Sequence, residues 1–141
     1  MADAFRAASD FEYFERQALR RGVPLRRTDQ SDRIGAGLSW VSTVKLRGRQ
    51  RELNSVISAF DPHESYEIRT DAGGVVCFTT VELIALSRTR TRMVIGMDLR
   101  PDSLPGRLFV QSLKFAKSNL TRRFKSRARL FATDVEARAS V

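Results

Sequence analysis

The chain has 141 residues, 42% of them hydrophobic and 29% charged, and its 25 Lys and Arg against 16 Asp and Glu give a formal net charge of +9. This length suits a single domain over residues 1–141, and the apolar content excludes an intrinsically disordered chain. No apolar run reaches the roughly 20 residues that span a bilayer, and the first residues lack the apolar core of a signal peptide. Because the single cysteine excludes an intrachain disulfide, a cytoplasmic protein is expected.

The N-terminal segment predicts two short helices between Ala4 and Gly22. Asp10 is a suitable N-cap for the second helix, and Gly22 ends that helix before Pro24. The apolar residues of the second helix recur at helical spacing and are Phe11, Phe14, Ala18 and Leu19. We therefore expect two small helices ahead of the rest of the fold.

After Pro24 the apolar residues alternate, which is typical of antiparallel strands with one buried face. For example, Trp40 and Val44 share one face, while Thr43 and Lys45 share the other. The expected strands cover residues 24–32, 38–47, 53–57, 66–70, 75–86 and 91–100. Turns are predicted at 48–50, 61–64 and 71–74, since Gly, Pro and Asp favour turn geometry.

Pro101 and Pro105 end the predicted sheet and open a helix of about 30 residues, roughly 45 Å long. Its apolar stripe contains Leu108, Phe109, Leu113, Ala116, Leu120, Phe124, Phe131 and Val135. The predicted fold class is α+β, with a curved antiparallel sheet wrapped around a long C-terminal helix and two short N-terminal helices. A sheet curved in this way leaves room between its concave face and the helix.

Several stretches of the chain carry a family resemblance. They are residues 10–22, 37–40 (Gly-Leu-Ser-Trp), 60–62 (Phe-Asp-Pro), 113–117 and 121–124. Together they resemble an uncharacterised bacterial branch of the polyketide cyclase/START-like (SRPBCC) superfamily, over nearly the whole chain. The resemblance implies a helix-grip fold that holds an apolar cavity for lipids, polyketides, quinones or other hydrophobic molecules.

One departure from that family concerns the N-terminus. Family members begin with a strand ahead of the two helices, and residues 1–5 leave no room for it. Either this strand lies upstream of the sequence, or the sheet lacks it and exposes an unpaired edge. Such an edge invites pairing with another chain, so a homodimer formed through the sheet edge is one expectation.

The inward faces carry small or polar residues where a solid core would favour Leu or Phe, among them Ser42, Ser55, Cys77, Thr79, Ser112 and Asn119. Either these residues leave a ligand-sized cavity, or they pair with neighbours and water in a closed core. The predicted function is non-covalent binding of a hydrophobic or amphipathic small molecule between the sheet and the C-terminal helix. The predicted wall of this cavity consists of Leu38, Trp40, Val44, Ile57, Val81, Met93, Met97, Leu113 and Leu120.

The sequence does not favour an enzyme, although a polyketide cyclase or dehydratase is an alternative. The single histidine, His63, lies in a predicted turn, and no residue pattern pairs it with a carboxylate. Glu82 and Asp98 fall on polar strand faces, where solvation is the simpler role. No catalytic residue is predicted, and no metal or cofactor is predicted because one His and one Cys do not make a ligand set.

Basic residues crowd the C-terminal helix, with no acidic residue between Lys114 and Arg129. They are Lys114, Lys117, Arg122, Arg123, Lys125, Arg127 and Arg129. A second alternative function is therefore docking on an anionic membrane or on nucleic acid. Nucleic acid is the less favoured partner, because no aromatic residues are interleaved for base stacking. A solvated cationic surface explains the same residues.

Overall fold

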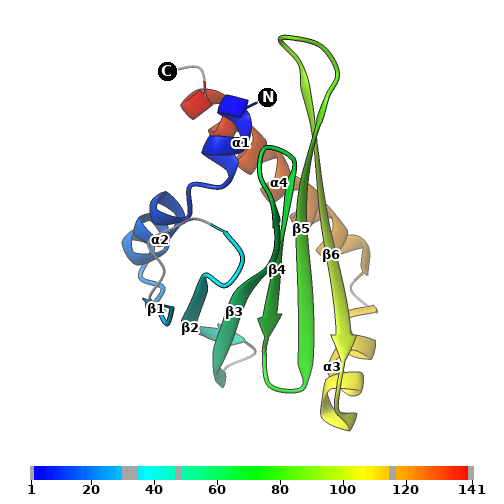
Figure 1. Cartoon of the computed structure of the whole chain (residues 1–141). Coiled ribbons are helices and arrows are strands. Elements are labelled where there is room, and N and C mark those ends of the chain that lie inside the picture. The colour runs from blue at the N-terminus through cyan, green and yellow to red at the C-terminus, as the bar shows by residue number, and fades with distance from the viewer. Residues whose placement is uncertain (1, 30–34, 47–48, 115–116, 140–141) are drawn as a thin grey trace.

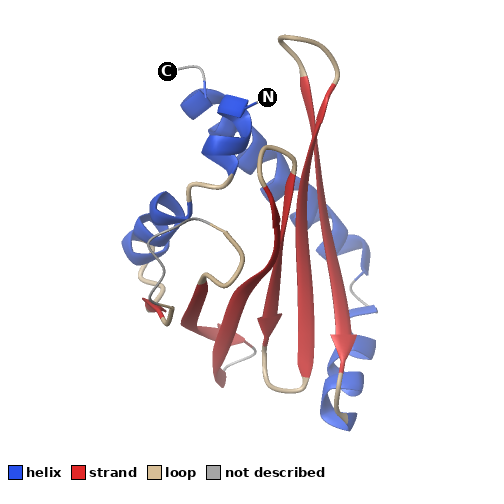
Figure 2. Ribbon diagram, viewed as in Figure 1, coloured by secondary structure: helices blue, strands red, loops and turns tan. Residues whose placement is uncertain are grey.

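The computed structural model describes residues 2–29, 35–46, 49–114 and 117–139 of the chain. Within these residues, two helices precede the strands and two further helices follow them (Figures 1 and 2). The helices are α1 (Ala2–Ala8), α2 (Phe11–Arg20), α3 (Leu104–Lys114) and α4 (Lys117–Ala139). The strands are β1 (Leu25–Arg27), β2 (Ser39–Leu46), β3 (Arg49–Asp61), β4 (Ser65–Asp71), β5 (Val75–Ala85) and β6 (Thr91–Pro101).

The described strands form one antiparallel sheet in the order β1-β2-β3-β4-β5-β6, so each strand pairs with its neighbours in sequence. The fold is α+β with the helix-grip arrangement of a curved sheet and a C-terminal helix, as predicted. Figure 1 shows α2 near β1, α1 beside the upper end of β4 and next to the end of α4, and α4 running behind β5 and β6. A register shift between Ile57 and Ala59 of β3 helps to bend the sheet, because such irregularities increase the local twist.

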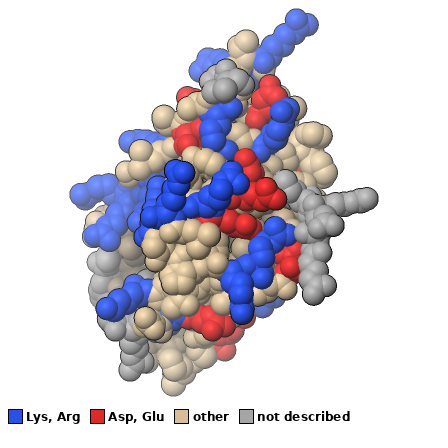
Figure 3. Space-filling model, turned by 90° about the vertical axis from the view of Figure 1, so that its left-hand side faces the viewer, with Lys and Arg blue, Asp and Glu red and all other residues tan. Residues whose placement is uncertain are grey.

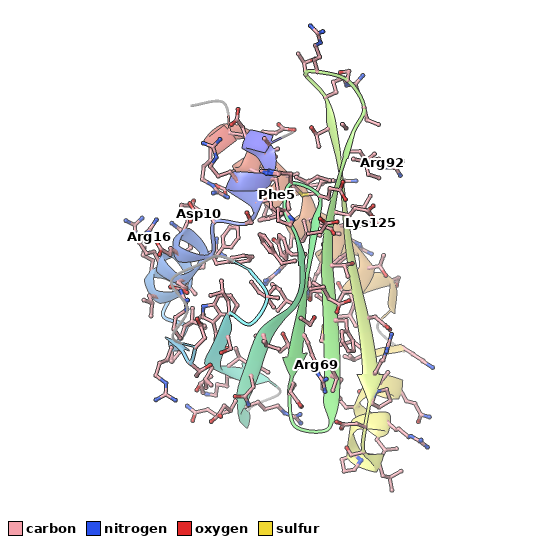
Figure 4. The ribbon with its side chains drawn as sticks, viewed as in Figure 1. Phe5, Asp10, Arg16, Arg69, Arg92 and Lys125 are labelled. Carbon is pink, nitrogen blue, oxygen red and sulfur yellow. The ribbon has the colours of Figure 1, made fainter. Side chains whose placement is uncertain are left out.

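The main core lies between the sheet and the two N-terminal helices. Phe5 of α1 and Phe11 of α2 pack on the inner face of the sheet (Figure 4 labels Phe5). The other buried side chains of this core come from the strands and from Leu38, which directly precedes β2. Those from the strands are Trp40, Ile57, Tyr66, Val81 and Leu83. The ring of Phe11 stands edge-on to that of Tyr66, with 5.1 Å between ring centroids. These side chains fill the inner face beneath α1 and the start of α2.

The C-terminal helical region covers the helix predicted from the sequence. It consists of α3 and α4, and residues 115–116 between them lie outside the described part of the chain. Val135, near the end of α4, is 2% exposed, whereas Leu120 is 37% and Leu130 is 68% exposed. Phe124 and Phe131 of the predicted stripe are half-buried, so burial along the stripe increases from Leu120 toward Val135, while Leu130 lies outside the stripe.

Aromatic and polar contacts hold the last turns of α4 against α2. The rings of Phe131 and Phe14 lie 5.7 Å apart, and Tyr13 Oη donates to Asp134 Oδ1 at 3.2 Å. The guanidinium carbon of Arg138 lies 4.1 Å from the centroid of the Tyr13 ring. A second, smaller core of Ala7, Ala8 and Val135 joins α4 to α1. The two N-terminal helices therefore hold the C-terminal part of α4.

Several predicted element boundaries shift in the structure. β1 has three residues, and residues 30–32 of the longer predicted strand lie outside the described part. β3 has 13 residues and begins at Arg49, so two residues of the turn predicted at 48–50 belong to the strand and residue 48 lies outside the described part. None of the described helices combines the length and the apolarity needed to cross a membrane.

Candidate ligand-binding site

A pocket of about 330 Å³ opens between α2 and the inner face of the sheet. We call it the α2 pocket. It is lined by Phe11, Phe14, Glu15, Ala18, Leu25, Trp40, Ser55, Ile68, Thr70 and Thr79. Helix α2 provides the roof, and five neighbouring strands, β1 to β5, provide the walls and the floor.

The position of α2 over the sheet follows from its sequence. Asp10 caps the helix by accepting a hydrogen bond from the backbone N–H of Tyr13 at 3.2 Å. Phe11 then anchors the first turn, with its ring 5.7 Å from that of Trp40. The second turn lacks such an anchor, because the small Ala18 faces the sheet there. The pocket opens beneath this second turn.

The floor of the α2 pocket is made of small hydroxyl residues from adjacent strands. Ser55 of β3 pairs in register with Thr70 of β4, and their hydroxyl oxygens lie 2.9 Å apart. Thr79 of β5 pairs with Ile68 of β4. Large apolar residues at these positions would fill the space, so the small side chains account for the hollow. The hydroxyl groups also offer donors and acceptors to a bound molecule.

Glu15 is a charged residue at the rim of the α2 pocket, and its carboxylate already has partners. Trp40 Nε1 donates to Glu15 Oε1 at 2.6 Å, and Arg27 Nη1 lies 3.6 Å from the same carboxylate oxygen. Arg27 also contacts Asp29, with Nε 2.8 Å from Oδ1. These contacts fix the orientation of the Trp40 indole and compensate the charge of Glu15. The pocket wall therefore presents mainly apolar surface.

Cys77 lies on the same inner face, beside the floor of the α2 pocket. Its Sγ is 3.8 Å from Thr79 Oγ1, and the side chain is half-buried. Burial raises the pKa of the Cys77 thiol, which disfavours the reactive thiolate. The structure thus offers a neutral, weakly polar side chain at this place rather than an activated nucleophile.

A second hollow of about 680 Å³ lies between α1, the end of α4 and the β5–β6 hairpin. Its lining includes Leu83, Met93 and Val135 below and the charged residues Asp3, Arg88, Arg90 and Glu136 around them. We call it the hairpin hollow. It is the larger of the two hollows, but charged residues of both signs line it, so it presents less continuous apolar surface than the α2 pocket.

The residues predicted to form one cavity wall are distributed over several places. Trp40 lines the α2 pocket and Met93 lines the hairpin hollow. Leu38, Ile57 and Val81 are buried in the main core. Val44 on β2 and Leu113 on α3 are half-buried, while Met97 is 54% and Leu120 is 37% exposed.

Sequence reasoning missed the contribution of α2 to the site. The helical spacing of Phe11, Phe14 and Ala18 was recognised as a packing face, and that face is the roof of the α2 pocket. Ser55 and Thr79 were singled out as small inward residues, and both line its floor. Which helix would cover these hydroxyls depends on long-range packing that the sequence pattern does not contain.

The residues considered for other chemistry lie apart from the α2 pocket. His63 is exposed in its turn with a φ of 71°, and Glu82 and Asp98 are exposed on the sheet. Among the described residues, no group of three or more His, Cys, Asp and Glu side chains is placed to hold a metal ion. On the side of the molecule that bears α2 and β1, basic and acidic side chains are interleaved (Figure 3).

Comparison with known proteins adds little to this picture. No protein-family profile and no curated protein matches the chain. Among solved structures, the crystal structure of the protein CV1439 from Chromobacterium violaceum is similar, with 19% sequence identity, a TM-score of 0.45, and coverage of 80% of this chain and 83% of that chain. A likeness at this distance concerns the general fold alone and assigns neither a family nor a function.

Proposed function

We propose that the protein binds a small hydrophobic or amphipathic molecule, such as a lipid, a quinone or a polyketide, without forming a covalent bond. The observation that carries this proposal is the α2 pocket. Its volume of about 330 Å³ lies near the lower end of the range of small-molecule sites, about 300–1,000 Å³. Apolar walls with a few hydroxyl groups are the usual composition of such sites.

The physical basis of binding is the burial of apolar surface against α2 and the sheet. Phe11, Phe14, Leu25, Trp40 and Ile68 provide this surface. Each Å² of apolar surface removed from water contributes about 25 cal/mol, and the cost of association reduces the net gain. The hydroxyls of the floor suit a carbonyl or hydroxyl group of the ligand, which would fix its orientation. The family resemblance of the sequence supports the same class of ligands.

The proposal can be tested with a fluorescent fatty acid or a fluorescent apolar dye and two matched variants. Ala18→Phe places a large ring in the α2 pocket, whereas Ala132→Phe places the same ring in the hairpin hollow. We expect Ala18→Phe to weaken probe binding at least tenfold, because it fills the space that the probe occupies. Ala132→Phe should bind as the wild type does. Thermal unfolding of both variants checks that they are folded.

Two results would contradict the assignment. If Ala132→Phe weakens binding and Ala18→Phe does not, the ligand occupies the hairpin hollow instead. If folded wild-type protein binds neither the fatty acid nor the dye, the proposal of an apolar ligand site loses its support.

A further inference from the structure

The outer edge of β6 is free in the described structure. β6 is the last strand of the sheet and pairs only with β5, over 11 residues from Thr91 to Pro101. No backbone hydrogen bond joins its outer side to any other described residue. The opposite edge of the sheet, β1, has only three residues. A long unpaired edge is a template for another strand.

The β5–β6 register shows which backbone groups point outward. Leu86 N donates to Arg90 O at 3.0 Å, which makes these two residues a hydrogen-bonded pair at the hairpin end. Since such pairs alternate along an antiparallel ladder, the even-numbered residues of β6 direct their N–H and C=O groups toward β5. The odd-numbered residues therefore direct theirs outward, and these are Thr91, Met93, Ile95, Met97 and Leu99.

The side chains of these five residues carry no charge, so no inward-pointing charge of β6 itself protects the edge. Natural sheets often protect an edge with an inward-pointing charge, a bulge or a proline within the strand. Here the pairing of β6 with β5 is regular, and its proline, Pro101, is the last residue of the strand. Met97 is 54% and Leu99 is 36% exposed at this edge.

We propose that the β6 edge pairs with the β6 edge of a second copy of this chain, antiparallel and with Ile95 opposite Ile95. In this register Met93 faces Met97, and all outward-bonding residues meet one another as hydrogen-bonded pairs. The inner apolar face of one sheet then continues into the other. The pairing obeys a twofold axis, so every contact except that of Ile95 with Ile95 on the axis occurs twice.

Charge complementarity selects this register. With Ile95 on the axis, Arg92 of each copy lies opposite Asp98 of the other. These are non-hydrogen-bonded positions, where side chains of facing residues come closest. The register shifted one way places Arg92 opposite Arg100. The register shifted the other way places Arg92 opposite Gly96 and Asp98 opposite Arg90, which lies outside the strand, so neither has an opposite-charge pair within β6. A shift by one residue would turn the apolar face outward.

The side chains that form these pairs are accessible in the single chain. Arg92 is exposed and extends away from the body of the molecule (Figure 4). Asp98 is 58% exposed, and its Oδ2 lies 2.9 Å from Nε of Arg100 in its own strand. In the proposed dimer Asp98 lies between this Arg100 and the Arg92 of the other copy. Arg100 also faces Arg90, which lies in the loop before β6 and not in the strand.

The test is sedimentation velocity over a micromolar concentration series with charge-reversal variants. Arg92→Asp and Asp98→Arg each place like charges at both pairs of the homodimer. We expect each variant to weaken dimerisation about 30-fold, or ~2 kcal/mol at 1.4 kcal/mol per factor of ten. An equimolar mixture of the two variants restores both opposite-charge pairs, so it should dimerise as the wild type does. Glu52→Arg, at an exposed position on β3, is the matched control and should not change dimerisation.

A second variant keeps the test decisive if a charge reversal disturbs folding. Met97→Pro removes an N–H that points outward, so it leaves the β5–β6 hydrogen bonds in place and abolishes part of the dimer ladder. The proposal is overturned if wild-type protein is monomeric throughout the series. It is also overturned if dimers persist unchanged in Met97→Pro, or if the mixture of charge variants dimerises no better than its components.

Discussion

Tyr66 shows how one side chain links the N-terminal helices to the sheet. It is 5% exposed, and its hydroxyl donates to the carbonyl of Ala8 at the end of α1 with an O–O distance of 2.7 Å. Burial raises the pKa of the Tyr66 phenol far above its usual range, because the phenolate would lose its hydration. The neutral phenol is therefore part of the folded state.

The variant Tyr66→Phe should lower the free energy of unfolding by about 1–2 kcal/mol at neutral pH, since it leaves the Ala8 carbonyl buried without this donor. The stabilisation by the neutral phenol is fully present below the unfolded-state pKa of about 10 and is lost as the pH rises above it. Urea unfolding at several pH values measures both effects. A stability difference from wild type that stays constant up to pH ~11 would contradict this role.

The burial of the Cys77 thiol can be tested through its reactivity. Because burial raises its pKa, the folded protein should react with iodoacetamide more slowly than the urea-unfolded chain at the same pH. The reaction rate of the folded protein should also reach half its maximum at a higher pH than the rate of the unfolded chain does. Cys77 is the single cysteine, so mass spectrometry reports on it alone. A folded-state midpoint at or below the ordinary thiol value of about 8.5 would contradict the burial.

At the scale of elements, α4 is held by its end. Val135 is 2% exposed and packs on Ala7 and Ala8 of α1, whereas Leu130 is 68% exposed one and a half turns earlier. Contacts between α4 and α2, such as the ring pair of Phe131 and Phe14, lie in the same last turns. The helix thus closes the fold through a short contact region.

Val135→Ala should lower the free energy of unfolding by about 2 kcal/mol, because it removes two buried methyl groups and leaves a cavity. For a domain of this size, that loss corresponds to a melting temperature lower by about 6 °C. Leu130→Ala is the control and should change stability by less than about 0.5 kcal/mol. Equal effects of the two substitutions in thermal unfolding would show that α4 packs differently.

The elements also show what the sequence pattern can and cannot predict. Alternation placed the strands correctly because each strand has one buried face, and Asp10 marked the start of α2 as predicted. The C-terminal stripe predicted the helical region of α3 and α4, but the deepest burial along it lies at Val135, near the end of α4. Periodicity indicates which side of an element is apolar, but it does not indicate how much of that side packs against another element.

The same limit applies to the site. The predicted wall residues are large and apolar, and three of them, Leu38, Ile57 and Val81, are packed into the main core. The α2 pocket instead lies where the inward residues are small, at Ser55 and Thr79. A cavity follows from missing volume, so small residues locate it better than large apolar residues do.

At the scale of the whole molecule, the helices cover the inner face of the sheet unevenly. Phe5 of α1 and the first turn of α2 lie over a filled core, while the second turn of α2 stands over a hollow. The β6 edge, with the exposed Met97, is the opposite edge of the sheet from β1, the strand that α2 contacts. Ligand binding at the α2 pocket and pairing at β6 therefore use separate surfaces, and each can be tested without the other.

The most direct test of the ligand site is the fluorescence of Trp40, which is the single tryptophan and lies in the pocket wall. We would titrate the protein with a bromine-labelled fatty acid and with a quinone, both of which quench indole emission on contact, and use the unbrominated acid as a control. The account predicts saturable quenching that an excess of unbrominated acid reverses and that Ala18→Phe suppresses. Emission unchanged by both quenchers, or quenched equally in Ala18→Phe, would contradict it.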